Sequence, residues 1–226
     1  MKEYITKSAT DAQRKHEHHK IFKKIDFFVL HPLPETIDIR QVIKAVESKI
    51  PSYYASNIDA FYIAHLKEFD LKDTNAMYKD GAVYISNRQE DVQDMVDDII
   101  HEIAHAIEEN HSDYFYSDER IQQEFLGKRK RLYDTLRQYG HIKDNNLDFM
   151  NLEYSHDLDM FFYENVGYEK LENFCMGLFV RPYGCTDLRE YFATSFEEYI
   201  LGDRDYVKKV CPRVYSKIIG MNKKRG

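Results

Sequence analysis

The sequence predicts an α+β fold in which a small mixed β-sheet packs on an amphipathic helix and a mostly helical C-terminal half follows. Three observations support this. Short apolar runs bounded by turn residues occur before residue 90, as expected for strands. Apolar residues recur at spacings of three and four from Asp91 to Glu109. After Asn110 helical periodicity dominates. A chain of 226 residues is long enough to bury a core of useful size.

The first half reads as strand, helix, strand, strand and helix. The run Asp26 to Leu30 predicts a buried strand that ends at the His-Pro-Leu-Pro segment 31–34. Residues 39–50 have helical spacing that Pro51 stops. Strands are expected at 61–64 and 81–86, and the helix 91–109 follows them.

The second half reads as helices around a less periodic segment. Helices are expected at about 118–138, 188–201 and 205–219, and residues 141–181 look like an insertion. Residues 1–24 are polar and read as a helical or disordered arm. We therefore expect an N-terminal arm, 1–24, ahead of a single domain, 25–226.

Composition argues against several classes of partner. A formal net charge of -7 is atypical of a nucleic-acid binder, and the basic runs 128–131 and 223–225 are interpreted as solvated charge. The three cysteines form no CxxC pair, which favours a reducing compartment. No apolar window reaches membrane-span length, and no leader segment is seen. We expect a cytoplasmic protein that binds neither nucleic acid nor membrane, of unspecified oligomeric state.

The sequence His101-Glu-Ile-Ala-His105 lies inside the helix predicted for 91–109. Residues four apart project from one helix face, so His101 and His105 can bind one metal ion with Glu102 beside them as general base. Zinc suits imidazole and carboxylate ligands, and a catalytic site uses three protein ligands. Composition alone gives about 0.04 chance matches to HExxH in such a chain. We therefore expect a zinc ion at this helix.

Two residues compete as the third ligand. His111 has the spacing of the long HExxHxxGxxH pattern, but Glu108 stands where that pattern needs a glycine to turn the chain. Glu190 lies at the edge of an apolar helix face, where a carboxylate needs a partner. Glu190 is equally well placed to complete a capping box with Asp187. Spacing alone does not decide whether Glu190 is a metal ligand or part of a helix cap. Glu197 and Glu198 are further candidates for the third ligand.

The combination of motifs resembles the catalytic domain of the anthrax lethal-factor type of zinc metallopeptidase, a group that includes the bacterial Pro-Pro endopeptidases. The matching elements are HEIAH at 101–105 and Tyr183-Gly184, Thr186, Glu190, Phe192-Ala193 and Phe196. The resemblance covers about residue 81 to the C-terminus. It implies a zincin-like fold with Glu190 as third zinc ligand and Tyr183 as a catalytic hydroxyl. The 84 residues between His105 and Glu190 form a long gap for this family, which points to the insertion at 141–181.

The expected function is thus a zinc-dependent endopeptidase acting on a peptide or protein substrate. Glu102 would act as general base, Tyr183 would donate a hydrogen bond to the oxyanion, and the strand 82–86 would pair with an extended substrate. The alternatives are a non-catalytic docking module of the same fold and a metzincin-like peptidase that uses His111. A phage-encoded or toxin-like effector acting in a host cell is the alternative biological role.

Overall fold

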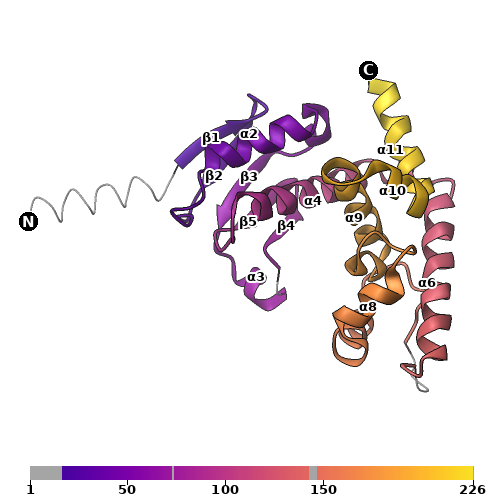
Figure 1. Ribbon diagram of the computed structural model, residues 1–226. Helices are drawn as coiled ribbons and strands as arrows, with labels where there is room; N and C mark the ends of the chain where they lie inside the picture. Colours follow the sequence, from indigo (N-terminus) through magenta and orange to yellow (C-terminus); the bar gives the residue numbers. More distant parts are fainter. Residues whose placement is uncertain (1–16, 73, 143–146, 226) are drawn as a thin grey trace, which may run out of the picture. The chain divides into compact units, whose positions relative to one another are not determined.

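The computed structural model describes residues 17–72, 74–142 and 147–225. The chain forms two compact units, residues 1–107 and 108–226. The first contains every named strand of the described chain, and the second is built from helices. The α+β class and the helical second half are therefore confirmed (Figure 1). The single-domain reading stays a prediction.

A five-stranded mixed sheet organises the first unit. Its strands are β1 (Glu17–Ile21), β2 (Ile25–Val29), β3 (Ala60–Ala64), β4 (Ala76–Lys79) and β5 (Ala82–Ser86). Their order is β1-β2-β3-β5-β4. The three central strands β2, β3 and β5 run parallel, whereas β1 and β4 are antiparallel to their neighbours. The carboxyl ends of β2, β3 and β5 consequently meet at one end of the sheet.

Alternation of side chains gives the sheet two different faces. Phe27, Phe61 and Val83 lie in register on one face and are fully buried. On the opposite face Phe28, Tyr62 and Tyr84 are half-buried and stack side by side, with ring centroids 5.2–5.3 Å apart. Period-two burial of this kind is typical of a sheet with one face in the core.

The first unit is completed by helices α2 (Ile39–Lys49), α3 (Lys67–Lys72) and α4 (Val92–Asn110) and by the short 3₁₀ helix η1 (Ser52–Ala55). The last three residues of α4 belong to the second unit. Asp38 caps α2 by accepting a hydrogen bond from the Arg40 N–H. The apolar residues of α2 and α4 are buried and make up much of the core: Ile39, Val42, Ile43, Val46, Met95, Val96, Ile99, Ile100, Ile103, Ala104 and Ile107.

Strand β4 forms the edge of the sheet next to β5. The two are joined by the two-residue turn Asp80-Gly81, in which both residues have positive φ (51° and 80°), as a type I′ hairpin requires. Strand β5 pairs with β3 on one side and β4 on the other. The prediction that strand 82–86 binds substrate by strand addition is therefore wrong, because no free edge is left on β5.

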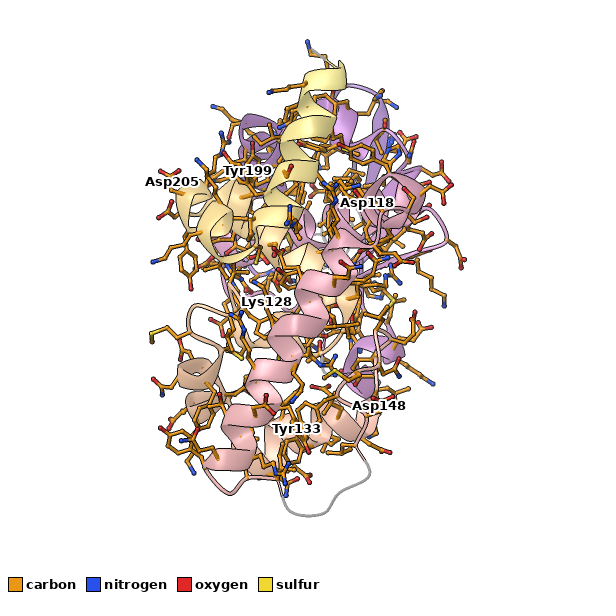
Figure 2. The ribbon with its side chains drawn as sticks, turned by 90° about the vertical axis from the view of Figure 1, so that its right-hand side faces the viewer. Asp118, Lys128, Tyr133, Asp148, Tyr199 and Asp205 are labelled. Atoms are coloured by element: carbon orange, nitrogen blue, oxygen red, sulfur yellow. The ribbon has the colours of Figure 1, made fainter. Side chains whose placement is uncertain are left out.

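The second unit consists of helices and short turns of helix. Its elements are α5 (Ser112–Tyr116), α6 (Arg120–Gln138), α7 (His156–Met160), η2 (Phe161–Val166), α8 (Tyr168–Cys175), η3 (Pro182–Cys185), α9 (Leu188–Leu201), α10 (Arg204–Val210) and α11 (Pro212–Arg225). Buried residues such as Phe149, Phe162 and Leu171 show that much of segment 141–181 packs into this core. Figure 2 places Lys128 near the middle of α6.

Half of the basic run in α6 is not solvated, which corrects the interpretation for Lys128 and Arg129, whereas Lys130 and Arg131 are exposed as expected. Arg129 is fully buried and donates hydrogen bonds to the carbonyls of Asn151 (3.3 Å) and Thr186 (3.2 Å). The Lys128 ammonium donates to the Leu178 carbonyl at 2.7 Å and also to the Val210 carbonyl. Both cations therefore hold unit 2 together instead of facing a partner.

Two boundaries differ from the expected ones. Residues 17–21 of the expected arm form β1, and residues 1–16 lie outside the described chain. The helix expected at 205–219 is two helices, because Pro212 lacks the N–H needed inside a helix and begins α11 instead.

Among the residues that the structure describes, no helix has the length and apolar character needed to cross a membrane.

Candidate metal centre

Helix α4 presents three side chains that can ligate a metal from a single turn. His101, Glu102 and His105 have ligand atoms that all lie within 4.8 Å of one another. Glu102 and His105 are buried, with 6% and 8% of their surface exposed, and His101 is half-buried. The residues around them in α4 include Ile100, Ile103 and Ala104, which are fully buried and anchor this turn in the core. The turn is thus held in a fixed position by packing.

The two imidazoles are placed as a zinc ion requires. Their Nε2 atoms lie 3.2 Å apart, and their ring planes are inclined at 77°. Two nitrogens bound to one tetrahedral zinc at 2.0–2.1 Å would be separated by about 3.3–3.4 Å. The same separation suits a hydrogen bond in which one ring donates to the other. The residues therefore fit zinc with little rearrangement.

The carboxylate of Glu102 lies against the sheet edge. Its Oε2 atom accepts a hydrogen bond of 2.5 Å from the backbone N–H of Tyr78 in β4. Tyr78 is opposite Val83 in the register, and its N–H points away from β5. The outer edge of β4 and the Glu102 carboxylate are thus neighbours.

A second carboxylate stands one helical turn before His101. Asp98 is half-buried and accepts a hydrogen bond of 2.9 Å from the side chain of Gln89, itself buried. The pKa of Asp98 is raised to about 6, mainly because burial disfavours the charged carboxylate. The hydrogen bond from Gln89 opposes this shift, and the negative charges of Asp94 and Glu102 add to it. The contact with Gln89 therefore holds Asp98 in place within the fold. Asp97 accepts a bond from Gln93 on the same helix.

This pKa predicts a pH-dependent effect of Asp98→Asn in the metal-free protein. Because the pKa of Asp98 is higher in the folded protein than in an unfolded chain, its carboxyl group carries no penalty below about pH 4, and the free energy of unfolding falls as pH rises from there through 6. Above pH 6 ionised Asp98 lowers the free energy of unfolding by about 2–3 kcal/mol. Asp98→Asn should raise stability by that amount at pH 7.5 and leave it unchanged near pH 4, as urea unfolding with a chelator present would measure. An equal effect at both pH values would show that the carboxyl charge is not responsible.

Tyr183 and Glu190 lie in the second unit, where the structure explains the local motif around them. Tyr183 belongs to η3, and a Cβ on Gly184 would come within 2.5 Å of the Thr194 hydroxyl in α9, so glycine permits this close packing. The Thr186 hydroxyl donates to the Tyr183 carbonyl (2.9 Å). Burial, followed by the charge of Glu190, raises the pKa of Tyr183. Its hydroxyl therefore stays protonated near neutral pH and can donate a hydrogen bond.

The capping role suggested for this segment belongs to Asp187. Its side chain accepts a hydrogen bond of 2.9 Å from the Glu190 backbone N–H, which makes Asp187 the N-cap of α9. This bond uses the main chain of Glu190 and not its carboxylate. The fallback ligands have other contacts, since Glu197 pairs with Arg181 at 2.7 Å and Glu198 accepts from the Asp203 N–H. Glu190 as third ligand stays a prediction.

His111 is poorly placed for the alternative ligand set. Helix α4 continues through Glu108 to Asn110, so the chain does not leave the helix where the HExxHxxGxxH pattern needs its turn. Glu108 is buried and pairs with Arg189 at 3.0 Å. With a rise of 1.5 Å per residue, His111 follows His105 by about 9 Å along the axis. That separation disfavours a shared metal ion.

Sequence reasoning did not identify Tyr78 or Gln89 as part of this site. Tyr78 belongs to a four-residue strand, and the local signal that could have revealed it is the Asp80-Gly81 dipeptide, which is typical of a two-residue hairpin. Gln89 carries no recognisable motif, because its contact with Asp98 depends on how the chain enters α4.

We compared the chain with protein-family models, curated proteins and solved structures, and none of these matches it. The resemblance to the lethal-factor type of peptidase therefore rests on the motif residues alone.

Proposed function

We propose that this chain is a zinc-dependent endopeptidase with its metal held on α4. One observation carries the proposal: His101 and His105 direct their Nε2 atoms to within 3.2 Å of each other, and the carboxylate between them contacts the outer edge of β4. Two of the proposed ligands, the proposed general base and a strand able to bind a peptide backbone thus lie within the first unit. A histidine pair with a purely structural role would not need the buried acid at that edge.

His101 and His105 would hold the ion, and the motif resemblance adds Glu190 as the third ligand. When bound, zinc supplies Lewis acidity, which lowers the pKa of a coordinated water and polarises a carbonyl group. Two histidines with one glutamate are an established ligand set for catalytic zinc.

Glu102 would take a proton from the attacking water and pass it to the leaving amine. Its buried position keeps bulk water from competing for that proton. The bond from Tyr78 N–H holds the carboxylate at the strand edge in the absence of substrate. Tyr183, kept protonated by its raised pKa, would donate a hydrogen bond to the oxyanion that develops on the carbonyl oxygen.

The outer edge of β4 is the proposed binding strand for the substrate backbone, in place of β5. An extended peptide adds to a sheet edge through main-chain hydrogen bonds, which give affinity without demanding a particular sequence. Pairing at Tyr78 would bring a peptide carbonyl next to Glu102, because the N–H of Tyr78 already contacts that side chain. The main chain of the substrate would then displace Glu102 from Tyr78 and leave the carboxylate to act as a base.

Removal and return of zinc test the proposal. Purified protein should contain about one zinc ion per chain and cleave members of a random peptide library, with products read by mass spectrometry. Treatment with a chelator should abolish cleavage, and one equivalent of zinc should restore it. A zinc-loaded protein that cleaves no peptide would support the docking-module alternative and contradict the peptidase proposal.

A further inference from the structure

A polar cavity of about 200 Å³ lies at the carboxyl end of the parallel strands in the first unit. Open α/β sheets commonly bind ligands outside this end of their strands. Neither HEIAH nor its neighbours in α4 line the cavity, so it is distinct from the metal centre. Its lining residues are His65, Phe69, Asp70, Thr74, Asn75, Ser86 and Arg88.

The strand order brings cationic and imidazole side chains together here. His31, His65 and Arg88 each follow one of the parallel strands β2, β3 and β5 by one or two residues. The His65 backbone N–H donates to His31 Nδ1 at 3.2 Å, and one terminal nitrogen of Arg88 lies 3.3 Å from His65 Nε2. Three positions distant in sequence thus form one group of nitrogen atoms beside the cavity.

Arg88 is the group in the cavity that can recognise an anion. It donates to Asp70 at 2.8 Å, but both side chains are at least half exposed, at 64% and 50%. An ion pair with that exposure contributes little stability, so a ligand carboxylate can compete with Asp70 for the guanidinium. A planar guanidinium binds carboxylates through two parallel hydrogen bonds. Asn75 and Thr74 add polar side chains to the same lining.

The cavity adjoins the start of β4, since Asn75 is one of its lining residues. Asn75 immediately precedes β4 and is already in register with β5, since its carbonyl accepts from the Ser86 N–H at 2.6 Å. It is three residues from Tyr78, or about 10 Å of strand. Antiparallel pairing is the more stable arrangement per residue. A peptide antiparallel to β4 would run from Tyr78 toward Asn75 and carry its C-terminal part toward the cavity that Asn75 and Arg88 line.

We propose that this cavity is a specificity subsite that selects a carboxylate on the C-terminal side of the scissile bond, about three residues from it. The carboxylate belongs to an Asp or Glu side chain or to the C-terminus of a short substrate. Arg88 binds it through its guanidinium, and Asp70 weakens binding by competing for the same group. The inference rests on the proposed peptidase function and on pairing along β4.

The test compares cleavage of matched peptides by zinc-loaded protein. A peptide cleaved by the wild type is synthesised with Glu or Gln at each of the four positions after the scissile bond. We expect kcat/KM to be about tenfold higher for Glu than for Gln at one of these positions. Arg88→Gln should bring that ratio to about one, and Asp70→Asn should increase it. Arg40→Gln, an exposed arginine on α2 outside the cavity lining, is the matched control and should keep the wild-type ratio.

The chemical source of the carboxylate is distinguished by C-terminal amidation. If amidation of a short peptide removes the preference and Gln substitution does not, the subsite binds a chain terminus; the reverse result identifies an acidic side chain. Equal kcat/KM for every Glu and Gln pair, or an unchanged ratio in Arg88→Gln, would overturn the inference while leaving the peptidase proposal intact.

A binding measurement keeps the subsite testable if no peptide is cleaved. Acetyl-Ala-Ala-Ala-Glu-Ala-amide and its Gln counterpart are titrated into zinc-loaded Glu102→Gln protein and followed by nuclear magnetic resonance. We expect the Glu peptide alone to shift the Arg88 side-chain N–H signal and to bind about tenfold more tightly. The same titration of the Arg88→Gln, Glu102→Gln double variant should show no difference between the peptides. Equal binding of both peptides to the protein that retains Arg88 would refute the subsite.

Discussion

Glu102→Gln should lower kcat/KM by about 10³–10⁴-fold while the protein still binds one zinc ion. General acid–base catalysis contributes an effect of that size, and an amide cannot take up the proton of the attacking water. The substitution is nearly isosteric, and its amide oxygen can still accept the hydrogen bond from Tyr78 N–H at the edge of β4. Steady-state cleavage of a library-derived peptide and zinc analysis of the same sample would measure both quantities.

Glu109→Gln is a suitable control, because Glu109 is an exposed glutamate at the end of the same helix. It should reduce kcat/KM far less than Glu102→Gln does. If Glu102→Gln cleaved the peptide at the wild-type rate, the hydrolytic role of HEIAH would be refuted. If it lost zinc as well, Glu102 would be a ligand and not the base.

Glu190→Ala should weaken zinc binding by more than about 100-fold, whereas His111→Ala should leave it unchanged. Loss of an outer partner of a metal ligand already costs 10–100-fold in affinity, so loss of a ligand should cost more. His111 follows an unbroken helix and lies about 9 Å beyond His105 along its axis. Competition with a chromogenic zinc chelator would give both affinities.

The fallback ligands provide the controls for that comparison. Glu197→Ala removes the ion pair with Arg181, and Glu198→Ala removes the acceptor for the Asp203 N–H. Both variants should retain zinc even if they are less stable. Loss of zinc in His111→Ala with normal binding in Glu190→Ala would contradict the resemblance to the lethal-factor type of peptidase at its centre.

Long elements with a strong period were predictable from sequence, whereas short or interrupted ones were not. Helix α9 was expected at 188–201, where it is observed, and α4 and α6 were located to within two residues. Strand β4 has four residues and includes Lys79, so its apolar pattern was too short to recognise. The helix expected at 205–219 failed because its periodicity was given more weight than Pro212.

The same distinction applies to the candidate site. The HEIAH group could be predicted because an i, i+4 spacing fixes its geometry within one helix. The choice of β5 as the substrate strand was wrong because strand order depends on contacts between distant segments. The group of His31, His65 and Arg88 was missed for that reason, since only the parallel order β2, β3, β5 brings these residues to one end.

The measurement that tests the central claim most directly is an anomalous difference map of a zinc-loaded crystal, collected on both sides of the zinc absorption edge. We predict one strong peak, 2.0–2.1 Å from the Nε2 atoms of His101 and His105, with a carboxylate oxygen of Glu190 as the third protein ligand and Glu102 outside the ligand set. A peak elsewhere with none at α4 would contradict the claim that this helix holds a catalytic metal.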